Sequence, residues 1–113
     1  PALITDKVET PNKLYYIYDV EDGEAMRGKS PETAEKLLKE KGRSPLTAAE
    51  VIALVTHTDV LSKHYVWAAG SRYAHADKVL FVYLDSGARP WLYWNYVDNS
   101  FDRLGAASCG SRA

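Results

Sequence analysis

Three segments in the second half of the chain show the two-residue alternation of side chains that is typical of β-strands. They predict strands at residues 65–69, 79–84 and 91–97. A loop over residues 85–90, which contains Gly and Pro, joins the last two strands as a hairpin. An earlier run rich in Tyr and Ile ends at a Glu-Asp-Gly turn signal and predicts the first strand at residues 14–20.

Apolar residues at helical spacing predict two helices between the first strand and the later ones. Ser30 offers a capping hydroxyl before Pro31, which suits the first position of a helix, and Gly42 ends this helix. Thr47 and Glu50 have the spacing of a capping box and begin the second helix. We expect this helix to carry Val51, Leu54, Val55 and Leu61 on one apolar stripe.

The alternation also assigns the strand side chains to two faces of the sheet. Leu80 and Val82 belong to an aliphatic face. The opposite, aromatic face contains Tyr65, Trp67, Phe81 and Tyr83. Because two amphipathic helices can cover the aliphatic face, we predict an α+β domain with an antiparallel sheet of about four to five strands and two helices packed on one face. One core is expected to contain Leu37, Leu54, Val55, Leu80 and Val82.

The aromatic face needs a cover of its own. Each large ring carries on the order of 150–250 Å² of surface, so several rings exceed the apolar patch that a monomer normally exposes. The cover is expected to be something other than the two helices. The N-terminal arm, upstream chain, a second copy of the protein, another protein partner and a small ligand all remain open.

Composition limits the classes of partner. The formal net charge of −1 gives no general attraction to nucleic acid or to an anionic membrane, so neither is expected as a partner. Cys109 is the single cysteine, which favours a reducing, cytoplasmic location. No apolar run approaches the roughly 20 residues that span a bilayer. The chain length fits one domain over residues 1–113, whose small, polar tail can add an edge strand.

Few residues offer catalytic chemistry. His57 and His64 lie seven residues apart, about 10 Å along one helix, which is too far to share a metal, and no cofactor is expected. Cys109 with either histidine is a weak candidate for nucleophilic catalysis. Pro1 is not expected to act as a catalytic base, because no regular strand follows to position it.

Two arginines follow Gly-Ser pairs and are candidates for binding an anion together with backbone amides. They are Arg72 and Arg112. The alternative for both is a solvated arginine that follows a turn.

Several short motifs in order along the chain carry a resemblance. They are Tyr16–Val20 with Asp22-Gly23, Ser44–Thr47, Ile52–His57, Gly70–Arg72 and Leu104–Gly110. Over residues 14–112 the chain resembles a domain-of-unknown-function family of hypothetical proteins, found mainly in actinobacteria. The resemblance implies a shortened member or the C-terminal part of a longer chain, and it implies no activity. This chain has Trp91-Leu92-Tyr93-Trp94 where the family has a Trp-Cys-Trp pattern, so no shared cysteine chemistry is carried over.

Three hypotheses for function follow. The first is a non-catalytic binding or protein-interaction domain that uses the aromatic face and Arg72 or Arg112. The second is a hydrolase- or transferase-type enzyme built on Cys109 and a histidine. The third is a structural segment of a larger protein. A short distance between Cys109 and a histidine favours the second, an open aromatic surface the first, and a covered one the third.

Overall fold

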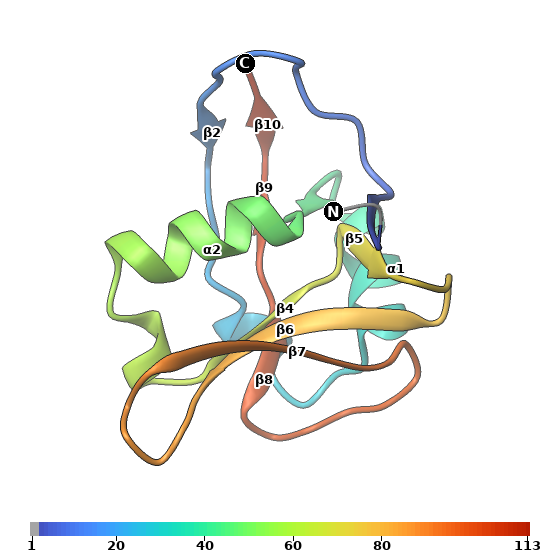
Figure 1. Cartoon of the computed structure of the whole chain (residues 1–113). Helices are drawn as coiled ribbons and strands as arrows, with labels where there is room; N and C mark the ends of the chain where they lie inside the picture. The colour runs from blue at the N-terminus through green and yellow to red at the C-terminus, as the bar shows by residue number, and fades with distance from the viewer. Residues whose placement is uncertain (1–2) are drawn as a thin grey trace.

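The computed structural model describes residues 3–113, so Pro1 lies outside the described residues. A mixed four-stranded sheet lies at its centre (Figure 1). In spatial order its strands are β7 (Pro90–Tyr96), β6 (Lys78–Leu84), β4 (Tyr65–Ala68) and β8 (Leu104–Ala106). This arrangement confirms the α+β class.

The expectation that the whole sheet is antiparallel is wrong at one edge, where β8 runs parallel to β4. β7 ends beside the start of β6, whereas β8 begins beside Tyr65 at the start of β4. The segment 97–103 therefore runs back across the aromatic face before β8 can begin. Phe101 in this segment packs on Trp67, with the ring centroids 6.3 Å apart.

Both helices begin where their capping signals predict. α1 (Pro31–Glu40) follows Ser30, whose side chain accepts a hydrogen bond from the Thr33 amide. α2 (Ala48–His57) follows Thr47 with both bonds of the capping box present. The second helix is shorter than expected, because the chain is extended at Thr58 and then forms the 3-10 turn η2 (Val60–Ser62). His64 is therefore not on the same helix as His57.

The two helices pack on opposite faces of the sheet, which corrects the prediction that both cover one face. α2 covers the aliphatic face, where Val51 packs in a core with Leu80 and Val82. α1 covers part of the aromatic face through Leu38, in a second core with Trp67. Leu37 packs against this second core, so the five expected core residues do not share one cluster. Large apolar side chains on both faces give each helix a surface to bury.

Short strand pairs extend from this centre. β1 (Ile4–Asp6) pairs with β5 (Ser71–Tyr73), and β3 (Ser44–Pro45) pairs with β9 (Ser108–Cys109). β2 (Ile17–Tyr18) pairs with β10 (Ser111–Arg112) in a ribbon that projects beyond α2 (Figure 1). The predicted strand at 14–20 is thus limited to two residues. The N-terminal arm, expected to lack regular structure, contributes β1.

The 3-10 turn η1 (Glu24–Met26) is held against β8 by a close crossing of two glycines. Gly23 has a left-handed φ of 98°, which favours glycine. A Cβ atom on Gly105 would lie 2.0 Å from the Gly23 carbonyl oxygen. The crossing brings Met26 into the core under Trp67.

Candidate functional site

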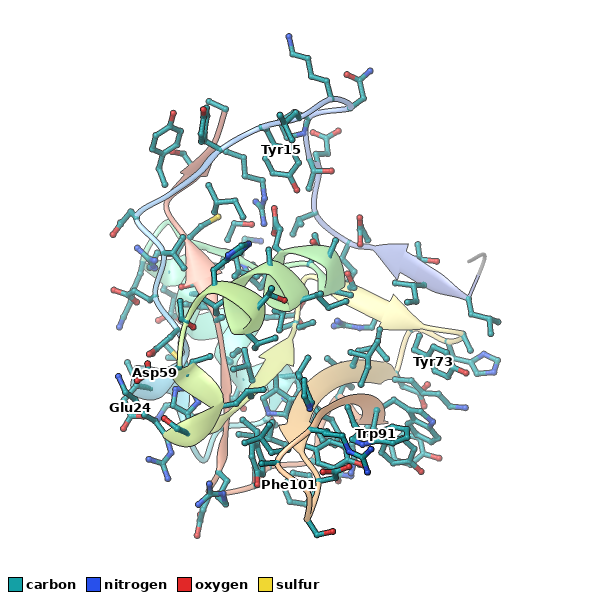
Figure 2. All side chains as sticks on the ribbon, turned by 60° about the vertical axis from the view of Figure 1, so that its left-hand side comes forward. Tyr15, Glu24, Asp59, Tyr73, Trp91 and Phe101 are labelled. Carbon is teal, nitrogen blue, oxygen red and sulfur yellow. The ribbon has the colours of Figure 1, made fainter. Side chains whose placement is uncertain are left out.

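The open part of the aromatic face forms a hollow of about 470 Å³, which we call the aromatic cradle. Its walls are the rings of five residues: Tyr65, Phe81, Tyr83, Tyr93 and Phe101. Asn95, Asp102, Arg103 and Leu104 complete the rim. Figure 2 shows Phe101 and Trp91 at the end of the molecule opposite the segment that carries Tyr15. The lining is almost entirely apolar.

Strand register brings these rings together. Phe81 pairs with Trp67 on one side and with Tyr93 on the other, so the three side chains share one face. The ring planes of Phe81 and Tyr93 meet at 84°, and those of Tyr65 and Tyr83 meet at 70°. Phe81 and Tyr83 meet at 43°, so none of these three ring pairs is parallel and the rings do not form a stack.

Burial divides the aromatic face into a closed end and an open end. Trp67 is 0% exposed, because α1, Met26 and neighbouring residues enclose it. The prediction that something other than the two helices covers this face is therefore wrong for the part of Trp67 that α1 covers, whereas Met26 and Phe101, which also contact Trp67, lie outside both helices. At the open end Tyr93 is 56% exposed and Phe101 is 43% exposed. The prediction that Tyr65, Trp67, Phe81 and Tyr83 share a face opposite Leu80 and Val82 is confirmed.

One cation contacts the rim of the cradle. The Arg103 guanidinium lies 4.8 Å from the centre of the Tyr65 ring. At Asp102 the backbone carbonyl accepts a hydrogen bond from Arg27. Near the start of β7, the Asp85 carboxylate accepts a hydrogen bond from Trp91 Nε1. Hydrogen bonds from the Arg89 amide, from Trp91 and from the Gly87 amide lower the pKa of the Asp85 carboxyl. These contacts lie in the loops on either side of β7.

The two candidate anion-binding arginines are occupied within the fold. Arg72 donates four hydrogen bonds, to Glu35 and to the carbonyls of Ala69, Ser71 and Ala76. Arg112 also donates four bonds, two of them to Glu50 and the others to Ser44 and Pro45. A guanidinium has five N–H groups, so each of these side chains keeps only one donor for any other partner.

Glu50 joins this network to the N-terminal arm, since Tyr15 donates a hydrogen bond of 2.8 Å to its carboxylate. Burial opposes ionisation of Glu50, but the bonds from Arg112, the Thr47 amide and Tyr15 outweigh it and keep the pKa of the carboxyl below its usual value. Burial and the negative charge of Glu50 raise the pKa of the Tyr15 phenol. The network fastens the projecting ribbon to α2.

Cys109 lies in the core under α2, and burial raises the pKa of its thiol. In residues 3–113 no hydrogen bond joins Cys109 to a histidine. His57 is on the exposed end of α2, and His64 is buried beside η1. Residues 3–113 therefore contain no hydrogen-bonded pair of Cys109 and a histidine of the kind that the enzyme hypothesis needs.

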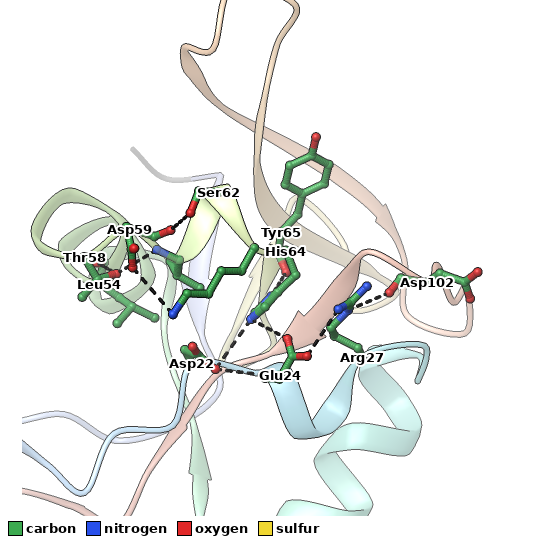
Figure 3. Close-up of polar contacts among 12 residues, drawn as sticks. Asp22, Glu24, Arg27, Leu54, Thr58, Asp59, Ser62, His64, Tyr65 and Asp102 are labelled. Atoms are coloured by element: carbon green, nitrogen blue, oxygen red, sulfur yellow. Dashed lines mark hydrogen bonds and ion pairs between the residues drawn. The ribbon is translucent and has the colours of Figure 1, made fainter.

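The surroundings of His64 could not be predicted from the sequence. Its Nδ1 lies 2.8 Å from the Tyr65 carbonyl oxygen, which accepts the ring proton. Its Nε2 lies 3.6 Å from one carboxylate oxygen of Asp22 and one of Glu24, too far for hydrogen bonds (Figure 3). Asp22 was interpreted only as part of a turn, and no spacing rule connects it with a residue some forty positions later. Within the described residues, no group of three or more His, Cys, Asp or Glu is arranged to hold a metal ion.

Across residues 3–113, no helix is long and apolar enough to cross a membrane. No curated protein and no solved structure matches the chain. The model of a family of unknown function, DUF5701, matches residues 3–113, which agrees with the resemblance found in residues 14–112. The chain therefore belongs to the DUF5701 family, a family of unknown function.

Proposed function

We propose that this protein is a non-catalytic binding domain and that the aromatic cradle takes up an apolar or aromatic group of its ligand or protein partner. The observation that carries the proposal is a hollow of about 470 Å³ whose ring walls stay open to solvent. Hollows of about 300–1,000 Å³ with apolar linings and a few polar groups are typical of ligand sites. The polar groups here are Asn95, Asp102 and Arg103 at the rim.

The cradle is also built to keep its shape. Phe81, Tyr83 and Tyr93 come from two long strands that pair along their whole length, from Lys78 with Tyr96 to Leu84 with Pro90. Phe101 is fixed from below by its contact with the buried Trp67. Side chains ordered in advance lose less entropy on binding, which favours affinity.

The proposal also includes a cellular location, a source and a partner for the binding domain. Cys109 is the single cysteine and a free thiol, and this supports a reducing, cytoplasmic location. A bacterial, mainly actinobacterial origin and a homodimer or protein partner at the aromatic face also stay predictions.

A titration with 4-methylphenol, followed by backbone amide NMR shifts, tests the cradle. We expect saturable shifts on β4, β6 and β7 and their loss in Tyr93→Ala. Tyr96→Ala is the matched control, because Tyr96 is 43% exposed on the same strand but is paired with Lys78 on the other face. Shifts that persist in Tyr93→Ala, or that spread evenly over the molecule, would contradict the proposal.

A further inference from the structure

We propose that the group taken up by the cradle is an alkylated ammonium cation, such as a trimethylammonium head. This inference rests on the proposed function and specifies the ligand class of the same site. Two features of the cradle support it: the angles between its rings and a cation already held on one ring.

The ring angles suit a round cation better than a flat ligand. The face of an aromatic ring is the negative side of its quadrupole and attracts cations within about 6 Å. Because Phe81 and Tyr93 meet at 84° and Tyr65 and Tyr83 at 70°, faces and edges of several rings border one hollow. A trimethylammonium group is nearly spherical and contacts walls at right angles, whereas a flat aromatic ligand is best held between parallel rings.

Arg103 shows that the cradle accepts a cation. Its guanidinium lies 4.8 Å from the Tyr65 ring centre and lines the hollow. In the described part of the chain, Arg103 forms no ion pair with a carboxylate. Its exposed side chain is thus held at the rim mainly by the ring, so we infer that an incoming cation displaces it.

The decisive experiment compares choline with 3,3-dimethylbutan-1-ol by calorimetric or NMR titration of the whole protein. The two probes have the same shape, and only choline is charged. We expect choline to bind on the order of tenfold more tightly. Equal affinity would overturn the ammonium inference and leave the proposed function standing. If neither probe binds, the inference fails, and the 4-methylphenol titration decides the proposed function separately.

Variants assign the preference to the groups named above. Tyr93→Leu keeps an apolar wall without a ring, so choline affinity should fall toward that of the neutral alcohol. Arg103→Ala should strengthen choline binding by removing the competing cation. Tyr96→Ala should change the affinity for neither probe. A choline preference that survives Tyr93→Leu would place the cation elsewhere and overturn the inference.

A last titration identifies how the cation is presented. A short peptide with one trimethyllysine, run beside the same peptide with unmodified lysine, carries the same head on a protein-like ligand. Tighter binding of the modified peptide than of choline supports a cation that a partner protein presents. Tighter binding of choline supports a small molecule as the source.

Discussion

At the scale of single residues, the same side-chain chemistry has opposite uses in this molecule. Arg112 and Arg103 are both arginines in the C-terminal part of the chain. Arg112 is enclosed and bonded to Glu50, whereas Arg103 lies on a ring at the surface. No local sequence signal separates them, because the partner of Arg112 is 62 residues away. Contact across the fold, not flanking residues, decides which arginine stays available.

Replacing Arg112 with Met tests the network. The change leaves the buried Glu50 carboxylate without its main partner, so we expect a loss of about 3 kcal/mol in the free energy of unfolding. Denaturant unfolding at pH 7 measures it. Lys63→Met is the control, because Lys63 pairs with Asp59 at the exposed surface and should cost less than about 1 kcal/mol. Equal effects of the two changes would contradict the network's role.

The pH dependence of stability tests the same carboxyl. The pKa of Glu50 is lowered in the folded state, so its contribution is complete above the usual value of 4.5 and is lost as pH falls through the folded pKa. Glu50→Gln removes this titration. We expect its free energy of unfolding to fall less steeply than that of the wild type as the pH is lowered below 4.5. Parallel curves would show that Glu50 does not carry the acid sensitivity.

The thiol of Cys109 offers a further residue-scale test. Burial raises its pKa and shields it, so little thiolate meets solvent in the folded state. We expect the reaction with Ellman's reagent at pH 8 to be slow in the native protein and fast in urea. A rapid native reaction would contradict this burial and reopen the enzyme hypothesis.

At the scale of elements, local sequence signals predicted where each helix begins better than where it ends or which element it packs against. Ser30 and Thr47 fix the helix starts because capping acts over three residues. The face that α1 covers could not be predicted, since its apolar stripe fits either side of the sheet. The parallel position of β8 was equally hidden, because it depends on residues 97–103 crossing a face and not on β8 itself.

Gly105→Ala tests the crossing that seats η1 on β8. The added Cβ would lie 2.0 Å from the Gly23 carbonyl oxygen, and backbone cannot move aside as a side chain does. We expect a loss of about 3 kcal/mol or more in the free energy of unfolding. Gly87→Ala is the control, since the nearest atoms belong to the side chains of Asp85 and Arg89 at 3.4 Å or more. A stable Gly105→Ala protein would show that the two segments can separate.

At the scale of the whole molecule, the aromatic side chains of the sheet fall into a buried group around Trp67 and an exposed group that lines the cradle. The grouping of Tyr65, Phe81 and Tyr83 on one face was predictable from strand alternation alone. The division of that face into a closed and an open end was not, because it depends on α1 reaching Trp67. The contribution of Phe101, which comes from an irregular segment, left no periodic signal either.

This division predicts that Trp67→Ala lowers the stability of the fold, whereas Tyr93→Ala removes ligand binding. Trp67 is 0% exposed in the core under α1, so its truncation should cost about 3–5 kcal/mol in the free energy of unfolding and leave the sedimentation coefficient unchanged. Tyr93 is 56% exposed, so its truncation should hardly alter the melting temperature while it removes ligand binding. Thermal melts beside analytical sedimentation measure both. If Tyr93→Ala instead turned an associated wild type into monomer, a second copy would be the occupant of the cradle. If Trp67→Ala did so without a loss of stability, the assignment of Trp67 to the core of one chain would be wrong.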